Sequence, residues 1–302
     1  MESDAIANGS ELPRESIENE DTTSLANIPG DFPDYDMDHR RRGIACIFNH
    51  DKFHQKTWPA DRIPSDRPGS SKDRDDLSRT LSQLDFEVKP FDNLTAAQVR
   101  KEIVKLAEKV DHTDHDCLLV VVMSHGQDGK ICAFDTMYDV EDVWMPFSSC
   151  ATLAGKPKLF FIQACRGFDE QEPLRDGGTK VSYSSTTIDG PGEYSIPTQA
   201  DFLFVYSTIP GYGSYRSEKY GAVFIQVLCD VLSQRGRRDD LISMMTVVLR
   251  KVAVEEIYVK EEVKKKIEEL CQMLCFTSQL IRQVYFPPKP TVSTPAKRCC
   301  LS

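Results

Sequence analysis

The chain has 302 residues and a net charge of −10, which is enough length to bury a sizeable core in one large domain or two ordinary ones. No apolar run approaches the roughly 18–20 residues that a membrane-spanning helix needs, and no apolar secretory segment precedes the body. We therefore expect the ten cysteines to be reduced thiols in a cytoplasmic protein. They form no metal-type pair of CxxC motifs, so no metal or other cofactor is expected.

The negative charge is concentrated at the start of the chain. Residues 1–38 carry eleven acidic residues and one arginine, whereas the remainder holds 36 acidic and 36 basic residues. A polar, acidic segment with few large apolar residues buries too little surface to offset the entropy of ordering it, so residues 1–34 are predicted to be disordered. The balanced body shows no basic surplus, and nucleic-acid binding is not expected.

From residue 43 onward, buried-strand patterns alternate with helical patterns. The predicted strands are 43–48, a second that begins at 86–88, then 117–123, 158–163, 201–206 and 280–286. The predicted helices are 72–84, 95–109, 221–234 and 239–256. Continuous apolar strands alternating with helices predict an α/β fold with a central, mostly parallel six-stranded sheet flanked by helices. Residues 167–200 have loop composition, and so long a loop is usually functional or disordered.

Two of these strands end at residues of catalytic type. Cys165 stands in Gln-Ala-Cys-Arg-Gly at 163–167, directly after one apolar strand, and His125 stands in Ser-His-Gly at 124–126, directly after another. Strand ends in an open α/β sheet are where ligands and catalytic groups collect, and a thiol near an imidazole suits nucleophilic catalysis. A free cysteine beside a strand is more often an inert core residue. The paired motifs at neighbouring strand ends favour the catalytic interpretation.

The pentapeptide with a histidine upstream is a caspase signature, and the chain resembles caspase-family cysteine proteases over about residues 35–286. It is most similar to short-prodomain executioner (effector) caspases, which implies a caspase-like three-layer fold. By this resemblance Cys165 attacks the scissile carbonyl and His125 handles the protons of the leaving amine. Gly126 has no side chain, so its backbone N–H is free to approach the oxyanion beside the N–H of Cys165.

The resemblance extends to the pocket for a substrate aspartate. Arg67, Gln163 and Arg216 match the family's pocket residues, and Ser214 and Tyr215 fall in its substrate-binding stretch. Any one arginine alone would be a surface charge. Two guanidinium groups and an amide together suit one short carboxylate, because arginine binds carboxylates bidentately and keeps its charge. The sequence therefore predicts cleavage after Asp.

Several positions depart from the family pattern. Gly213 and Val223 stand where the family usually has bulky aromatic residues, and a charged, helix-like run at 255–270 replaces a specificity loop. These departures leave the Asp requirement intact but leave the preference upstream of Asp open. His112, His115 and the remaining histidines have no catalytic context and are expected at the surface.

The family matures by cleavage between a large and a small subunit. The expected division is 1–34 propeptide region, 35–189 large-subunit part, 190–286 small-subunit part and 287–302 flexible tail. Asp189 is the predicted linker site and Asp176 the second candidate, while Asp21 is predicted for propeptide removal with Asp31 as the alternative. The processed halves are expected to stay together and to form a homodimer through the strand at 279–286.

Three functions are considered. The first is an active Asp-specific endopeptidase of apoptosis or a related cascade, with protein substrates that expose an Asp site. By resemblance its partners would be an upstream initiator caspase and inhibitor-of-apoptosis proteins. The second is a non-cleaving caspase-like regulator that binds another caspase, against which the intact Cys165 and His125 argue. The third is an adaptor that uses the acidic segment.

The chain ends Lys-Arg-Cys-Cys-Leu-Ser at 297–302. A cysteine four residues from the end, followed by this pattern, fits a prenylation box in which Cys299 would be farnesylated. A four-residue motif also arises by coincidence, and caspases generally end near the last strand. We expect a mostly cytosolic protein with at most a minor membrane-associated fraction.

Overall fold

One mixed sheet organises the described part of the chain. The structure, a computed structural model, describes residues 34–59, 62–127, 129–166, 200–214, 216–254 and 272–290. The chain divides into two units, Met1–Pro33 and Asp34–Ser302, and every described residue belongs to the second. Six strands lie in the order β11-β8-β7-β3-β1-β2. These strands are β1 Ile44–Asn49, β2 Glu87–Asp92, β3 Leu118–Met123, β7 Lys158–Gln163, β8 Phe202–Tyr206 and β11 Cys275–Ser278. Neighbours are parallel except β11, which is antiparallel to β8.

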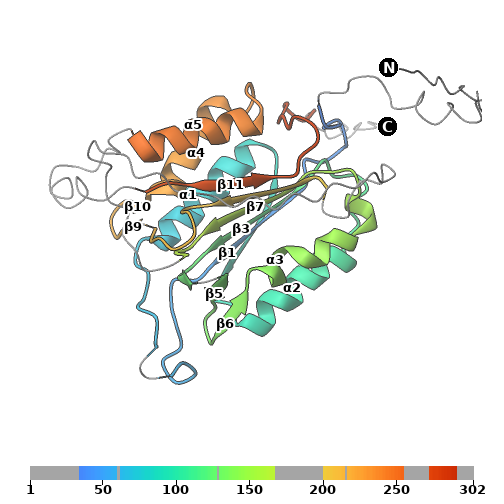
Figure 1. The fold of residues 1–302 in the computed structure, drawn as a ribbon. Coiled ribbons are helices and arrows are strands. Elements are labelled where there is room, and N and C mark those ends of the chain that lie inside the picture. Colours follow the sequence, from blue (N-terminus) through green and yellow to red (C-terminus); the bar gives the residue numbers. More distant parts are fainter. Residues whose placement is uncertain are drawn as a thin grey trace, which may run out of the picture. The chain divides into compact units, whose positions relative to one another are not determined.

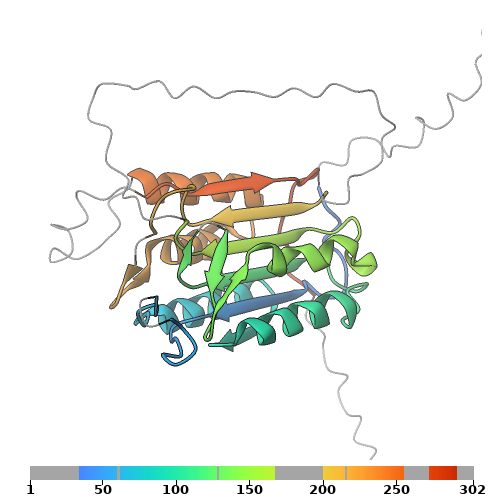
Figure 2. The same cartoon turned by 60° about the horizontal axis from the view of Figure 1, so that its bottom comes forward.

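Helices cover both faces of this sheet (Figure 1). α1 Ser70–Gln83, α4 Val223–Arg235 and α5 Leu241–Val254 lie on one face, and α2 Ala96–Glu108 and α3 Glu141–Trp144 lie on the other. Figure 2 shows the strands of the sheet side by side between these layers. The predicted mostly parallel, six-stranded sheet flanked by helices is confirmed. None of the helices in the described residues is long and apolar enough to span a membrane.

Smaller elements complete the fold. The hairpin elements β4 Gly126–Gln127, β5 Lys130–Cys132 and β6 Met137–Asp139 form a three-stranded sheet, and β9 Arg216–Ser217 pairs with β10 Gly221–Ala222. Two 3₁₀ turns, Met145–Ser149 and Ala151–Leu153, precede β7. In chain order, each small sheet follows a strand of the main sheet and precedes a helix, so each extends the connection that leaves that strand's end.

The strands contribute side chains to two hydrophobic cores, because successive side chains point to opposite faces of a sheet. Leu119, Val121 and Met123 of β3 join the core beneath α1, α4 and α5. The alternating residues Leu118, Val120 and Val122 join the core beneath α2. All six residues of β3 are buried, which explains why the strand reads as one continuous apolar run.

α2 begins where its sequence predicts. Thr95 Oγ1 accepts the N–H of Gln98 at 3.2 Å, and Gln98 Oε1 accepts the N–H of Thr95 at 2.9 Å, which forms a capping box. Val99 and Ile103 are buried against the sheet as expected. Val104, another apolar residue of this helix, is 39% exposed and lies outside this core-facing stripe.

The last strand of the sheet is not the predicted one. The sixth position is taken by β11, Cys275–Ser278, whereas residues 280–286 form no strand of the sheet. That apolar segment instead packs across the end of the core: Val284 and Phe286 are buried, and the N–H of Tyr35 donates to Gln283 O at 2.9 Å. Two of its apolar residues are therefore buried outside any strand, whereas Ile281 is 58% exposed. Among the described strands, β11 therefore forms this outer edge of the sheet.

Candidate active site

Two adjacent strands bring the predicted catalytic residues to the same edge of the sheet. Met123 at the end of β3 is in register with Gln163 at the end of β7, and the N–H of Ser124 donates to Gln163 O at 3.0 Å. His125 and Cys165 each follow two residues after this pair. The parallel register is therefore what places a thiol and an imidazole at neighbouring strand exits.

The thiol of Cys165 is a free, partly exposed group. The N–H of Ser214 donates to Cys165 Sγ at 3.3 Å, and the same sulfur lies 3.9 Å from Ser214 O. The following residue, Arg166, pairs its N–H with Tyr212 O at 3.0 Å. The chain after β7 is thus held along the segment that follows β8, which is the stretch predicted to bind substrate.

The imidazole of His125 is oriented by a backbone carbonyl. His125 Nε2 lies 2.8 Å from Ser65 O, and because a carbonyl only accepts, Nε2 carries the hydrogen. Nδ1 is then the basic nitrogen of the neutral ring. Burial lowers the pKa of His125 more than the bond to Ser65 raises it. The ring is therefore neutral at pH 7 and has one nitrogen free to take up a proton.

Gly126 is required by close packing. A Cβ at this position would lie 2.8 Å from Cys165 O and 2.9 Å from Ala164 Cβ. Gly126 stands opposite Ile131 in the β4–β5 ladder, and the bond of 2.9 Å from Cys132 N–H to His125 O makes Gly126 and Ile131 a non-hydrogen-bonded pair. The N–H of Gly126 therefore lies outside this ladder, beside the cysteine segment.

Three predicted pocket residues converge beside the thiol. Arg67 is 3% exposed and donates from Nη1 to His50 O at 2.8 Å and to Ser70 Oγ at 2.9 Å. Arg216 of β9 donates from Nη1 to Pro68 O, next to Arg67. Burial, and then the charge of Arg216, lowers the pKa of Arg67 to about 10. Two arginines that are 149 positions apart in the sequence therefore lie close enough for the charge of Arg216 to lower the pKa of Arg67.

The amide of Gln163 lies next to the cysteine contact. Its Nε2 donates to Ser214 Oγ at 2.7 Å, so one serine contacts both the thiol, through its backbone, and the amide, through its side chain. Gly213 is partly exposed beside it, and the buried Val223 begins α4. Predicted residue Tyr215 lies outside the described residues. The same holds for Asp21, Asp31, Asp176, Asp189 and Cys299.

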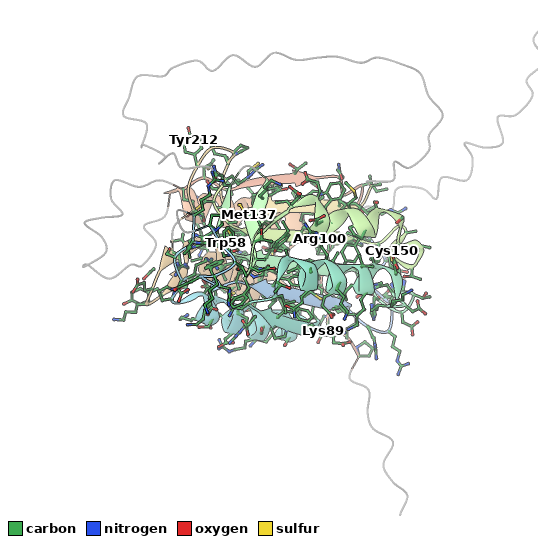
Figure 3. The ribbon with its side chains drawn as sticks, turned by 90° about the horizontal axis from the view of Figure 1, so that it is seen from below. Trp58, Lys89, Arg100, Met137, Cys150 and Tyr212 are labelled. Atoms are coloured by element: carbon green, nitrogen blue, oxygen red, sulfur yellow. The ribbon has the colours of Figure 1, made fainter. Side chains whose placement is uncertain are left out.

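Sequence reasoning missed two parts of this site. One is Ser65, whose role uses only its carbonyl oxygen and so leaves no side-chain signal. The other is an apolar wall made of Phe53, Trp58, Cys132 and Met137. The Phe53 ring lies 5.4 Å from the His125 ring, centroid to centroid. Figure 3 shows Trp58 and Met137 toward one end of the sheet and Cys150 toward the other. The two aromatic residues fall in an irregular segment, where no periodicity marks them.

The expectation that the other histidines lie at the surface was wrong for three of them, whereas His39 and His54 are partly exposed. His50, His112 and His115 are buried. His112 Nδ1 lies 3.0 Å from His115 Nδ1, and His112 Nε2 lies 2.9 Å from Leu106 O. Burial lowers the pKa of His115 to about 4. The rings of His112 and His115 bond each other, and His112 also bonds a backbone carbonyl, which offsets part of the cost of burying them. In the described ranges, no group of three or more His, Cys, Asp or Glu residues could hold a metal ion.

The fold and the paired strand exits are those of a cysteine hydrolase. A caspase domain model matches residues 42–285. Caspase-1 of Spodoptera frugiperda is 39% identical over 269 residues, covering 88% of this chain and 86% of that protein. Caspase drICE of Drosophila melanogaster is 38% identical, covering 85% of this chain and 73% of that protein. Caspase-6 of Gallus gallus is 37% identical, covering 84% of each.

A solved structure agrees with these matches. The crystal structure of Caspase-1 from Spodoptera frugiperda has a TM-score of 0.70 to this chain at 39% sequence identity, covering 85% of this chain and 96% of that chain. The chain therefore belongs to the caspase family and is a cysteine peptidase with effector-caspase-like relatives. The predicted family is confirmed.

Proposed function

We propose that the chain is a cysteine endopeptidase that cleaves after Asp, is made as a zymogen and acts in apoptosis or a related proteolytic cascade. The observation that carries this specificity is the contact of Arg216 with Pro68 O, which holds it beside Arg67. Burial and then the charge of Arg216 lower the pKa of Arg67, so the charge of Arg216 disfavours a second positive charge on Arg67. A short carboxylate is the ligand that relieves this repulsion while accepting two guanidinium forks.

The proposed chemistry follows from the oriented groups. The sulfur of Cys165 forms a bond to the scissile carbonyl carbon, and the carbonyl oxygen takes up negative charge near the N–H groups of Gly126 and Cys165. Nδ1 of His125 takes up the thiol proton as the S–C bond forms and delivers it to the departing amine as the C–N bond breaks. Water then attacks the thioester while His125 accepts a proton from it, and as the C–S bond breaks His125 returns that proton to the sulfur of Cys165. Ser65 O keeps the ring in one orientation through both steps.

The alternative is a caspase-like regulator that binds another caspase without cutting. Gly213 and Val223 favour it, because they replace the aromatic residues that usually wall the upstream subsites. These positions bear on side chains upstream of Asp and leave the arginine pair untouched. We therefore propose that this chain differs from its relatives in its preference for the residues upstream of Asp and keeps the requirement for Asp itself.

The proposal is tested with peptides that differ only in the residue before the cut. Wild type should turn over the Asp peptide and not its Asn or Glu counterparts. Cys165→Ala should abolish turnover while the protein stays folded, because a small side chain replaces a partly exposed one. Cys150→Ala is the matched control at the other end of the sheet (Figure 3) and should keep full activity. Equal turnover of all three peptides would overturn the Asp specificity, and no turnover by folded, processed wild type would favour the regulator.

Maturation and assembly form a further part of the proposal. We expect cleavage after Asp189, with propeptide removal after Asp21, by an upstream initiator caspase, and control by inhibitor-of-apoptosis proteins. β8 and β11 come from the proposed small-subunit part, and β8 pairs with β7 of the large-subunit part, which supports fragments that stay together. Among the described residues, β8 is the one sheet neighbour of β11, and the outer edge of β11 is the surface that we propose for the homodimer.

The C-terminal motif supports only a minor membrane fraction in an otherwise cytosolic enzyme. One farnesyl chain on Cys299 would give marginal, reversible binding. Labelling cells with a farnesyl analogue should mark wild type and spare Cys299→Ser. An unlabelled wild type would make the motif a coincidence.

A further inference from the structure

Asp73 is a buried carboxylate that joins the two arginine segments of the pocket. It lies in the first turn of α1 and is 1% exposed. The N–H of Ala222 donates to Asp73 Oδ2 at 2.8 Å and approaches Oδ1 at 3.1 Å. Ala222 is the cross-strand partner of Arg216 in the β9–β10 hairpin. The carboxylate therefore ties the helix that follows Arg67 to the hairpin that carries Arg216 (Figure 1).

Two glycines allow these segments to approach without intervening side chains. A Cβ on Gly221 would lie 1.9 Å from Asp73 Oδ1, and a Cβ on Gly69 would lie 2.5 Å from Glu218 O. Both glycines have positive φ, +93° and +88°, which a side chain would strain. The hairpin and the arginine loop are thus in direct backbone contact, and Asp73 is the charged group at that contact.

The surroundings of Asp73 are mostly positive. Arg67 from the preceding loop, Lys72 from α1 and Arg216 from β9 act on the carboxylate, and the carboxylate raises the pKa of the Cys229 thiol of α4, though less than burial does. Burial raises the pKa of Asp73 to about 7, although the Ala222 N–H and these cations lower it. Near neutral pH, the pocket therefore exists with Asp73 either ionised or protonated.

We infer that Asp73 is a positioning residue for recognition of the substrate aspartate: it holds Arg216 and Arg67 in one pocket and does not itself touch substrate. The inference rests on the proposed Asp specificity. A carboxylate that only stabilised the start of α1 would bond that helix's own N–H groups. Asp73 instead bonds an N–H 149 residues away.

Charge gives the inference a second, distinct consequence. A substrate carboxylate brought to the two arginines adds negative charge near Asp73 and favours its protonated form. Binding is then coupled to proton uptake, so the affinity for an Asp peptide should be higher at pH 6 than at pH 8. Asp73→Asn keeps an oxygen acceptor for the Ala222 N–H but cannot titrate, so its affinity should not vary with pH through this group.

The test measures catalysis and binding together. In the active enzyme, Asp73→Ala should raise KM for an Asp peptide about tenfold or more, because a buried N–H loses its acceptor, while kcat changes less than threefold. In the Cys165→Ala background, the Kd of the same peptide should rise in parallel. Asp73→Asn should stay within about threefold of wild type at pH 6 and lose the pH dependence of Kd. Asp75→Ala, an exposed acid in the same helix, is the control.

Alkylation of Cys165 by iodoacetamide separates positioning from general damage, since this small neutral reagent needs no arginine pocket. Its rate should be unchanged in Asp73→Ala. If that variant does not fold, Asp73→Asn and Gly221→Ala, which presses on the carboxylate from the hairpin side, carry the test. In Asp73→Ala, or in Gly221→Ala where it replaces that variant, KM and Kd within threefold of wild type, or an alkylation rate that falls as much as kcat/KM, would overturn the inference. For Asp73→Asn, a Kd that keeps the wild-type pH dependence would contradict the proton coupling. A wild type that ignores Asp would instead refute the proposed function.

Discussion

Replacing Arg67 with methionine should remove Asp turnover while leaving the free energy of unfolding nearly unchanged. Arg67 is almost fully buried, and burial followed by the charge of Arg216 lowers its pKa to about 10. One pKa unit corresponds to about 1.4 kcal/mol, so keeping this guanidinium charged in the empty pocket costs about 3 kcal/mol. Methionine fills much of the same volume without charge and removes that cost.

The opposing term comes from the hydrogen bonds of Arg67. It donates to His50 O at 2.8 Å and to Ser70 Oγ at 2.9 Å. Ser70 keeps its own donation to Asn49 Oδ1 at 2.6 Å, so the main loss is the donor to His50 O. Leaving a buried acceptor without its donor costs about 1–3 kcal/mol. The two terms oppose each other, and the net change should lie within about 2 kcal/mol of zero.

Activity has no such compensation. Removing one partner of a buried charge pair costs about 3–5 kcal/mol, which corresponds to a loss of kcat/KM on the order of 10²- to 10⁴-fold for an Asp peptide. Steady-state kinetics and urea unfolding measure the two effects on the same preparation, with Lys72→Met on the exposed side of α1 as control. A loss of more than about 4 kcal/mol of stability would make Arg67 a structural residue. A fall in kcat/KM of less than tenfold would refute its place in the pocket.

Three further outcomes are expected. Gly126→Ala should cost about 1–3 kcal/mol of stability and remove most of the activity, because the new Cβ would lie 2.8 Å from Cys165 O. A melting curve and a turnover assay check the two effects. His115 has a folded pKa of about 4 against about 6.5 unfolded, so its contribution to stability is complete above pH 6.5 and is lost as pH falls towards 4. His115→Gln should therefore flatten the drop in urea midpoint between pH 7 and pH 5, and an unchanged drop would contradict this. Mass spectrometry of self-processed protein should find cleavage after Asp189, and a fully active preparation with an intact linker would make that site irrelevant to activation.

The parallel strands could be predicted because each is buried on both faces. Residues 118–123 and 158–163 are continuous apolar or buried runs, which only a covered sheet accommodates. β11 could not be found in this way. Its residues Cys-Phe-Thr-Ser are half-buried or exposed, whereas residues 280–286 are more apolar and pack without a partner strand. An edge strand has one neighbour, and its pattern carries correspondingly less information.

The burial of three histidines was also not predicted from the sequence, and the reason is similar. Whether a histidine is buried depends on the partner that its ring nitrogens find in three dimensions. His112 and His115 are three residues apart in the chain, yet their contact of 3.0 Å depends on the turn between them and on Leu106 O. No local pattern distinguishes such a pair from two surface histidines.

The candidate site likewise contains residues that could be predicted from the sequence and residues that could not. Cys165, His125 and the arginines could be predicted because their proposed roles reside in side-chain chemistry. Ser65 acts through a carbonyl, and Asp73 acts through Ala222, 149 residues away. The groups that do chemistry are thus encoded by residue type, whereas the groups that orient them are encoded by register and close approach. Gly69, Gly126 and Gly221 belong to both groups. Their residue type is what permits the close approach, since one added carbon at each position would displace a functional segment.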